Sequence, residues 1–173
     1  MSLVATMNSP WWVKRFSRLA LFAMLLSVLL YLSFDYFSPR YRLGLNGNAS
    51  LPGWIYLVRV GDKFDLQKGE IIALHPPHNP YFPDRYVFLK MVMGVPGDVV
   101  TESERRFSIN GDYVGYAKTH TSDGEPLETG PVGTLPEGEY FVWTPHEDSY
   151  DSRYQDIGWI GEERIIGRAV RIF

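Results

Sequence analysis

The serine whose surroundings best suit chemistry is Ser50. It lies in the stretch Asn46-Gly-Asn-Ala-Ser-Leu-Pro-Gly53, directly before a run of β-branched and aromatic residues. The glycines and the proline of this stretch favour a fixed, exposed turn. A serine hydroxyl is inert at neutral pH unless a neighbouring base takes its proton, so Ser50 needs such a base to act as a nucleophile. Taken alone, a serine in a loop of this kind is more often structural or merely exposed.

Lys90 is the candidate for that base. It stands in Tyr86-Val-Phe-Leu-Lys-Met-Val-Met-Gly-Val95, with apolar residues on both sides, and a lysine is rarely buried without a partner. Burial penalises the ammonium form and lowers the pKa from about 10.4 toward the 7–8 that suits a general base. The alternative is a lysine on an edge strand whose amine reaches solvent. A buried lysine with a lowered pKa could serve Ser50 as its general base.

Other polar and aromatic residues have weaker claims. His75 and His78 could bind a metal, but no third ligand lies close in sequence, and exposed loop histidines are the simpler interpretation. His146-Glu-Asp148 could supply acid–base groups or metal ligands, and a solvated turn is favoured there. Trp143 and Trp159 are expected to pack in the core. We therefore predict that the chain binds no metal and no cofactor.

The composition excludes several classes of function. Residues 36–173 carry 14 of the 17 basic and 19 of the 20 acidic residues, whereas a nucleic-acid-binding domain is normally basic. Nucleic acid is therefore not an expected partner. The sequence has no cysteine, which excludes disulfides, a thiol nucleophile and cysteine-ligated metals. Its 173 residues fit one domain plus an anchor better than two domains.

The amino-terminal segment predicts a membrane anchor. The stretch 19–34 is 16 residues without a charge, and flanking aromatic residues extend it toward the roughly 30 Å of a bilayer core. A cleavable signal peptide would need a small-x-small site soon afterwards, and a buried core helix would need a polar face. Neither feature is present. We predict a cytoplasmic segment over 1–18, a transmembrane anchor over 19–37 and an extracytoplasmic domain over 38–173.

The orientation of the anchor follows from its charges. Lys14, Arg15 and Arg18 precede the apolar stretch, and only Arg40 and Arg42 follow it closely. The positive-inside rule therefore places the amino terminus in the cytoplasm and the domain outside the inner membrane of a bacterium.

The rest of the chain has the pattern of strands. Apolar runs with high β-propensity alternate with turn residues, and Asn110-Gly111 is a strong signal for a two-residue hairpin turn. The segment 119–134 is loop-like. We predict a mainly β domain, a twisted sheet or partly closed barrel. The expected strands lie at 54–60, 71–74, 86–95, 107–109, 113–114, 140–143 and 165–172.

Five motifs in order resemble those of the type I signal peptidase superfamily, which are serine peptidases with a Ser–Lys dyad. The resemblance covers roughly residues 46–170. The motifs are Ser50-Leu-Pro52, Leu89–Asp98 with its G-x-P-G-D ending, Asn110-Gly111, Asp148-Ser-Tyr-Asp-Ser-Arg153 and Ile166-Gly-Arg-Ala169.

Within that superfamily, the sequence is most similar to the conjugative-transfer peptidases of the TraF type. Those have one amino-terminal anchor and a nucleophile box of the form N-x-T-x-S-x-P-x-G-x-Y. Asn46, Ser50, Pro52 and Tyr56 match this box. The chain departs from it at Asn48, which stands where the box has threonine, and at its glycine, which comes one residue early.

The resemblance implies roles for further residues. Ser149 would bind the Lys90 amine and aim it at Ser50, while an ion pair of Asp151 with Arg153 would brace the turn. The oxyanion hole would consist of the Ser50 backbone N–H and the Asn48 side-chain amide. Asp148 stands where the superfamily has asparagine, and an extra carboxylate near the lysine would raise its pKa unless it points away.

The resemblance also implies a function. We expect a membrane-bound serine endopeptidase that cleaves exported precursors, with a pilin precursor of a conjugation system as substrate and a cyclic pilin as a conceivable product. The expected partners are that precursor, the lipids of the inner membrane and the conjugation or secretion machinery. Two alternatives stay open: a general type I signal peptidase, and a catalytically silent scaffold component of a secretion or conjugation complex.

Overall fold

The structure is a computed structural model that describes residues 10–47, 50–83 and 85–173. The chain divides into two compact units. One unit extends to Pro39 and contains the amino-terminal helix, and the other, Arg40–Phe173, contains all the strands. We describe each unit by itself.

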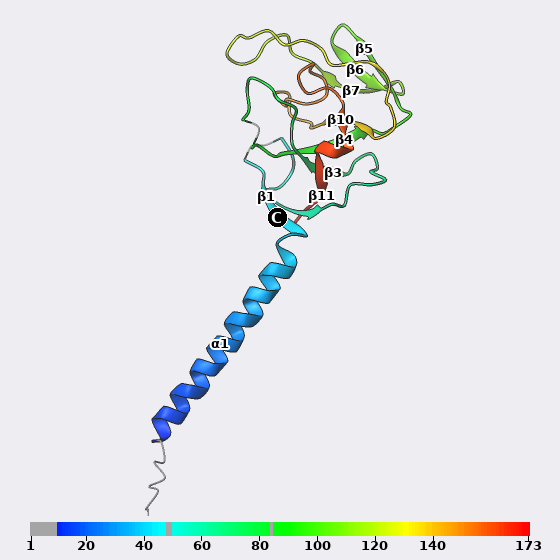
Figure 1. Cartoon of the computed structure of the whole chain (residues 1–173). Coiled ribbons are helices and arrows are strands. Elements are labelled where there is room, and N and C mark those ends of the chain that lie inside the picture. The colour runs from blue at the N-terminus through cyan, green and yellow to red at the C-terminus, as the bar shows by residue number, and fades with distance from the viewer. Residues whose placement is uncertain (1–9, 48–49, 84) are drawn as a thin grey trace, which may run out of the picture. The chain divides into compact units, whose positions relative to one another are not determined.

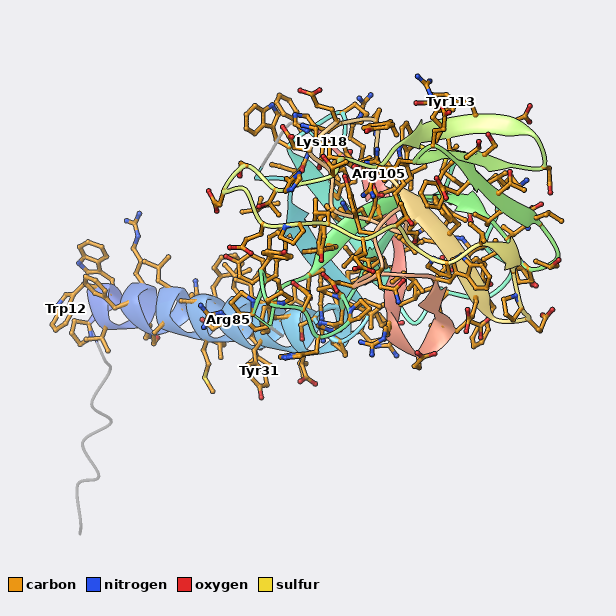
Figure 2. All side chains as sticks on the ribbon, turned by 90° about the horizontal axis from the view of Figure 1, so that it is seen from above. Trp12, Tyr31, Arg85, Arg105, Tyr113 and Lys118 are labelled. Carbon is orange, nitrogen blue, oxygen red and sulfur yellow. The ribbon has the colours of Figure 1, made fainter. Side chains whose placement is uncertain are left out.

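In the described part of the amino-terminal unit, residues 10–39, one helix, α1 (Trp11–Phe37), extends over 27 residues. The helix begins after Pro10, whose carbonyl oxygen accepts hydrogen bonds from the N–H groups of Val13 and Lys14. None of its residues is buried, and Trp12 and Tyr31 project from its surface (Figure 2). The helix is long and apolar enough to cross a membrane. It begins before the predicted anchor and ends at the same residue.

The second unit is mainly β, as the sequence predicts, and consists of two antiparallel sheets (Figure 1). The larger sheet has seven strands in the order β1-β2-β11-β3-β4-β9-β10. Its strands are β1 (Tyr41–Leu45), β2 (Ile55–Val60), β3 (Ile71–Leu74), β4 (Phe88–Gly94), β9 (Glu139–Trp143), β10 (Ile160–Gly161) and β11 (Ile165–Arg171). The strands that the structure describes do not close into a barrel, because β1 and β10 stay at the two ends of this order.

The smaller sheet has four strands in the order β7-β6-β5-β8. They are β5 (Val99–Ser103), β6 (Arg106–Ile109), β7 (Asp112–Tyr116) and β8 (Gly133–Thr134). The turn between β6 and β7 is the predicted hairpin: Asn110 and Gly111 have φ angles of 52° and 89°, the positive values that this turn requires. A short 3₁₀ helix, η1 (Glu162–Arg164), precedes β11.

Three hydrophobic clusters hold the domain together. One lies between β3, β4 and β9 and includes Ile72, Leu74 and Val142. A second joins the smaller sheet to β9, and Trp143 and Trp159 pack against it as predicted. The third lies under β2 and includes Tyr56. The first cluster matters most for the site, because it packs around the strand that carries Lys90.

The strand prediction missed four strands. The strand β1 follows directly on the anchor, and β5 follows a turn and has only two apolar residues before three polar ones. The other two, β8 and β10, have only two residues each. Short strands of this kind form because a neighbouring strand offers backbone partners, and this leaves no local periodicity to detect.

Candidate active site

Ser50 lies in the loop between β1 and β2, and this loop is tied together at its base by Asn46. The Asn46 side-chain amide donates hydrogen bonds to the backbone oxygens of Leu51 (2.8 Å) and Gly53 (3.0 Å). Ser50 itself is only 8% exposed. The loop is therefore more enclosed than the sequence predicts, and its position is fixed by buried polar contacts.

Tyr56 braces the same loop from β2. Its side chain is fully buried, and its hydroxyl donates a hydrogen bond to the backbone oxygen of Pro52. The sequence match at Asn46, Pro52 and Tyr56 thus corresponds to a set of contacts around Ser50. Asn48, the expected oxyanion donor, lies outside the described residues.

Lys90 lies on β4, between β3 and β9, so it is not on an edge strand. Its backbone pairs with Ile72 of β3, and the residue is 7% exposed. Its amine lies 5.3 Å from the centre of the Phe88 ring. Burial lowers the pKa of Lys90 from 10.5 to about 8, although the Asp151 carboxylate works in the opposite direction. The amine is therefore partly neutral near neutral pH, as a general base must be.

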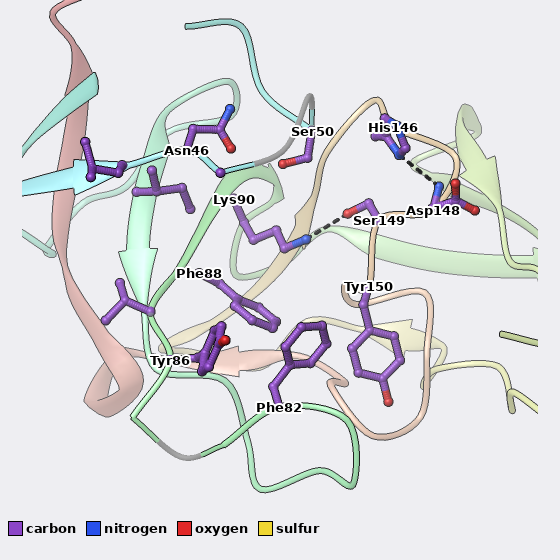
Figure 3. Close-up of a pocket in the computed structure, with 14 residues that line it drawn as sticks. Asn46, Ser50, Phe82, Tyr86, Phe88, Lys90, His146, Asp148, Ser149 and Tyr150 are labelled. Atoms are coloured by element: carbon purple, nitrogen blue, oxygen red, sulfur yellow. Dashed lines mark hydrogen bonds between the residues drawn. The ribbon is translucent and has the colours of Figure 1, made fainter. Parts of the chain in front are cut away.

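Ser149 contacts the Lys90 amine directly. The Nζ atom of Lys90 donates a hydrogen bond of 2.7 Å to the Oγ atom of Ser149, which is 4% exposed. Figure 3 shows Ser50 on the other side of the amine from the aromatic residues, and Ser50 lines the same pocket. The structure thus brings Ser50, Lys90 and Ser149 into one site, although 59 residues separate Lys90 from Ser149 in sequence.

The turn after Ser149 is held by a buried ion pair. The Nε and Nη2 atoms of Arg153 donate to the two carboxylate oxygens of Asp151 at 2.8 and 2.9 Å. Arg153 also donates to the backbone oxygens of Ser149 and Tyr116. Such a fully bonded pair fixes geometry more than it adds stability, and here it fixes the backbone of Ser149.

Asp148 points away from Lys90. Its carboxylate forms an ion pair with Lys118, which comes from the segment after β7. This contact raises the pKa of Lys118 and lowers the pKa of Asp148. The Asp148 carboxylate, which stands where the motif has asparagine, is therefore paired with the Lys118 ammonium group.

The pocket has a volume of about 560 Å³. Ser50, Lys90 and Ser149 line one part of it, and the rest has an aromatic wall (Figure 3). Phe82 packs edge-on against Phe88, with ring centres 5.0 Å apart. The hydroxyl of Tyr150 donates to Asp156 at 2.5 Å. Burial, together with this bond, raises the Tyr150 pKa. A peptide in this pocket would meet an apolar surface beside the reactive groups.

The histidines do not form a metal site within the described part of the chain. His75 and His78 are exposed, and His146 lines the pocket. Across residues 10–47, 50–83 and 85–173, no group of three His, Asp or Glu side chains is placed to hold a metal ion.

Two residues of the site were missed by the sequence analysis. Thr144 follows β9 and is fully buried, and its hydroxyl donates to Ser149 Oγ at 2.5 Å. Lys118 balances Asp148. No local signal marks either residue, because each acts on a group that lies five or 30 positions away.

Most of the chain is similar to known proteins. Residues 13–173 match the family described as signal peptidase, peptidase S26. The conjugal transfer protein TraF of Agrobacterium fabrum is 28% identical over 125 residues, which covers 62% of this chain and 69% of the relative.

A second relative and a solved structure are also similar to parts of this chain. The probable signal peptidase I-2 of Synechocystis is 31% identical over 109 residues, covering 61% of this chain and 47% of the relative. This chain thus spans about half the length of that relative. The crystal structure of a signal peptidase I from Enterococcus faecalis is 25% identical, covers 60% of this chain and 96% of that one, and superposes with a TM-score of 0.39.

Proposed function

Since the chain belongs to the signal peptidase family, peptidase S26, we propose that it is a serine endopeptidase that cleaves exported precursor proteins. The observation that carries this proposal is the Lys90 amine, which is buried, has a pKa of about 8 and lies in one pocket with Ser50. A buried amine without a negatively charged partner in direct contact is costly to keep, and its use as a base accounts for it.

In this proposal Ser50 attacks the scissile carbonyl while Lys90 takes its proton. Lys90 then passes the proton to the leaving amine, and the same groups activate water to resolve the ester. Ser149 orients the amine by accepting its hydrogen bond. The Ser50 backbone N–H and the Asn48 side chain would stabilise the oxyanion. Asp151 and Arg153 take no part in proton transfer and support the Ser149 backbone.

The helix α1 would hold this domain at the membrane. At 1.5 Å per residue, its 27 residues extend about 40 Å, enough to span a bilayer core of roughly 30 Å. We propose one crossing over its apolar part, 19–37, with the amino terminus in the cytoplasm of a bacterium. The anchor and a membrane-bound precursor would then meet in one thin layer, which raises their effective concentration.

The TraF relative makes one precursor class the favoured substrate. That relative's name connects it with conjugal transfer, and we propose a pilin precursor, processed together with conjugation machinery, as the substrate here. If the new amino terminus of the pilin lies close to the Ser50 ester, it can displace the serine in place of water and give a cyclic product.

The test is cleavage by the full chain in detergent micelles or in co-expression. A small pilin-like precursor should be processed by the wild type and left intact by Ser50→Ala. Intact-mass measurement distinguishes the products, because a cyclic pilin is about 18 Da, one water, lighter than the linear peptide between the same ends. Cleavage of many unrelated precursors would favour a general signal peptidase. If the amount of uncleaved precursor were the same with Ser50→Ala as with the wild type, a scaffold role would be favoured.

A further inference from the structure

Thr144 follows β9 and contacts the side chain of Ser149. It is fully buried and does not line the pocket that Ser50, Lys90 and Ser149 share. Its hydroxyl donates a hydrogen bond of 2.5 Å to the Oγ atom of Ser149. Its hydrogen bond to Ser149 therefore connects Thr144 to the site.

The Ser149 oxygen receives two hydrogen bonds at once. The Lys90 amine donates to it at 2.7 Å and Thr144 donates at 2.5 Å. A hydroxyl oxygen has two acceptor lone pairs and one O–H donor, so these two bonds use both lone pairs. The Ser149 proton must then point away from the Lys90 nitrogen, whose own lone pair stays available for the proton of Ser50.

The backbone of Ser149 is held by other residues, so the hydrogen bond from Thr144 acts on the direction of the side-chain hydroxyl. The backbone N–H of Ser149 donates to the His146 backbone oxygen at 3.1 Å, and its carbonyl accepts from Arg153 at 3.1 Å. With the backbone fixed at both ends, the direction of the side-chain hydroxyl depends on what binds the oxygen.

We propose that Thr144 is a positioning residue that holds the Ser149 hydroxyl as an acceptor toward Lys90. It thereby keeps the lone pair of the Lys90 amine directed at Ser50. This inference rests on the proposed Ser–Lys chemistry. It adds a third hydroxyl to the site, one that contacts no substrate.

The charged groups near Lys90 are bound to partners other than Thr144. Asp151 raises and Arg153 lowers the Lys90 pKa, and these two residues bind each other. His146 lines the pocket, and Asp148 is paired with Lys118. The neighbouring strands β3 and β9 contribute apolar residues at this level, such as Ile72 and Val142.

Loss of the Thr144 hydroxyl has a defined consequence. The freed lone pair lets Ser149 turn and donate its proton to the Lys90 nitrogen, which favours the neutral amine and occupies the lone pair that Ser50 needs. Thr144→Val, which keeps the shape of the side chain, should lower kcat about 10- to 100-fold with little change in KM. The acid limb of the pH–rate profile should move down by about half a unit.

The experiment compares Thr144→Val with Thr144→Ser in the full chain in detergent. Thr144→Ser keeps the hydroxyl and loses a methyl group, so it should retain the wild-type rate and pH profile even if its melting temperature falls. In a Ser149→Ala background, Thr144→Val should add no further loss of rate. A wild-type rate for Thr144→Val, equal losses for both variants, or an additive loss in the Ser149→Ala background would each overturn the proposal.

A second measurement is independent of activity. The pKa of Lys90 can be followed by NMR with ¹⁵N-labelled lysine, assigned with Lys90→Met. Thr144→Val should lower this pKa and Thr144→Ser should leave it unchanged. If the wild type cleaves no precursor, the proposed function fails, and the titration still decides whether Thr144 controls the hydroxyl. An unchanged Lys90 pKa in Thr144→Val would overturn that control.

Discussion

Two lysines of this domain contact adjacent residues of one turn, Lys90 at Ser149 and Lys118 at Asp148, and they have opposite properties. Lys90 is 7% exposed and its pKa falls to about 8 because burial penalises the ammonium ion. Lys118 is partly exposed, and its hydrogen bond to Asp148 raises its pKa. Figure 2 shows Lys118 near Arg105, whose guanidinium donates to the Lys118 backbone oxygen at 2.6 Å.

The difference shows how one short turn keeps two charges apart. Asp148 and Ser149 are adjacent in sequence, yet the carboxylate binds Lys118 and the hydroxyl binds Lys90. If the carboxylate faced Lys90, the amine would be held as an ammonium ion and lose its value as a base. Lys118 thus allows an acidic residue to stand next to the orienting serine.

The largest difference between the two lysines is expected when each is replaced in turn. Lys90→Ala should abolish precursor cleavage, with a loss of about 10⁴-fold or more, because the base is gone. Lys118→Ala should keep most of the activity. The rates are measured with the full chain in detergent. Ser50→Ala combined with Lys90→Ala should be no worse than either single variant, since the two groups act as a unit. Normal cleavage by Lys90→Ala would show that the base is another residue.

The adjacent residues Asp148 and Ser149 offer a matched pair. Ser149→Ala removes the acceptor of the Lys90 amine and should lower kcat by about 10- to 1000-fold, or about 1.4 to 4 kcal/mol, with a smaller effect on KM. Asp148→Asn keeps the shape of its side chain and should change the rate little. Steady-state kinetics at pH 8 measure both. Equal effects of the two substitutions would contradict the orienting role of Ser149.

The pH dependence of the free energy of unfolding should also differ between the two lysines. The folded-state pKa of Lys90 lies 2.5 units below 10.5, so the unfolded chain binds the extra proton between about pH 8 and 10.5. The free energy of unfolding therefore rises with pH in this window. Lys90→Met removes this dependence and should stabilise the domain by roughly 2–3 kcal/mol more at pH 6 than at pH 10. Denaturant unfolding at the two pH values measures it.

Lys118→Met is the control for that measurement. The pKa of Lys118 is raised in the folded state, so its contribution to stability has the opposite sign and is lost as the pH rises. A pH dependence like that of Lys90→Met in this variant would show that the effect does not come from burial of the amine.

The smallest effect is expected for the charge of Asp148 on Lys90. In Lys118→Ala the carboxylate loses its cation and pulls more strongly on the Lys90 proton, which raises the Lys90 pKa. The acid limb of the pH–rate profile should move up by a few tenths of a unit at low salt and return toward wild type at high salt. A downward shift would show that Asp148 does not act on Lys90 in this way.

The sequence was sufficient to predict the mainly β fold, the Asn110-Gly111 hairpin, the buried environment of Lys90 and the packing of the two tryptophans. These features follow from local patterns: apolar runs, a turn pair and aromatic residues. The sequence alone did not predict the Asp148–Lys118 pair or the hydroxyl of Thr144. The ion pair depends on how the segment after β7 meets the turn after β9, and the hydrogen bond of Thr144 depends on how that turn folds back on itself. No periodicity encodes either contact. The direction of the Asp148 carboxylate was left open for the same reason.

The separation of Lys90 and Ser149 in sequence links the base to folding. In an unfolded chain the lysine regains a pKa of 10.5, and at pH 7 only about one molecule in 3000 carries a neutral amine. In the folded domain, with a pKa of about 8, roughly one in ten does. The neutral form of the Lys90 amine therefore becomes accessible at pH 7 only when the domain folds and β4 pairs with its neighbours. Under the proposed mechanism, a chain that has not yet folded would lack the neutral lysine amine and would therefore be inactive.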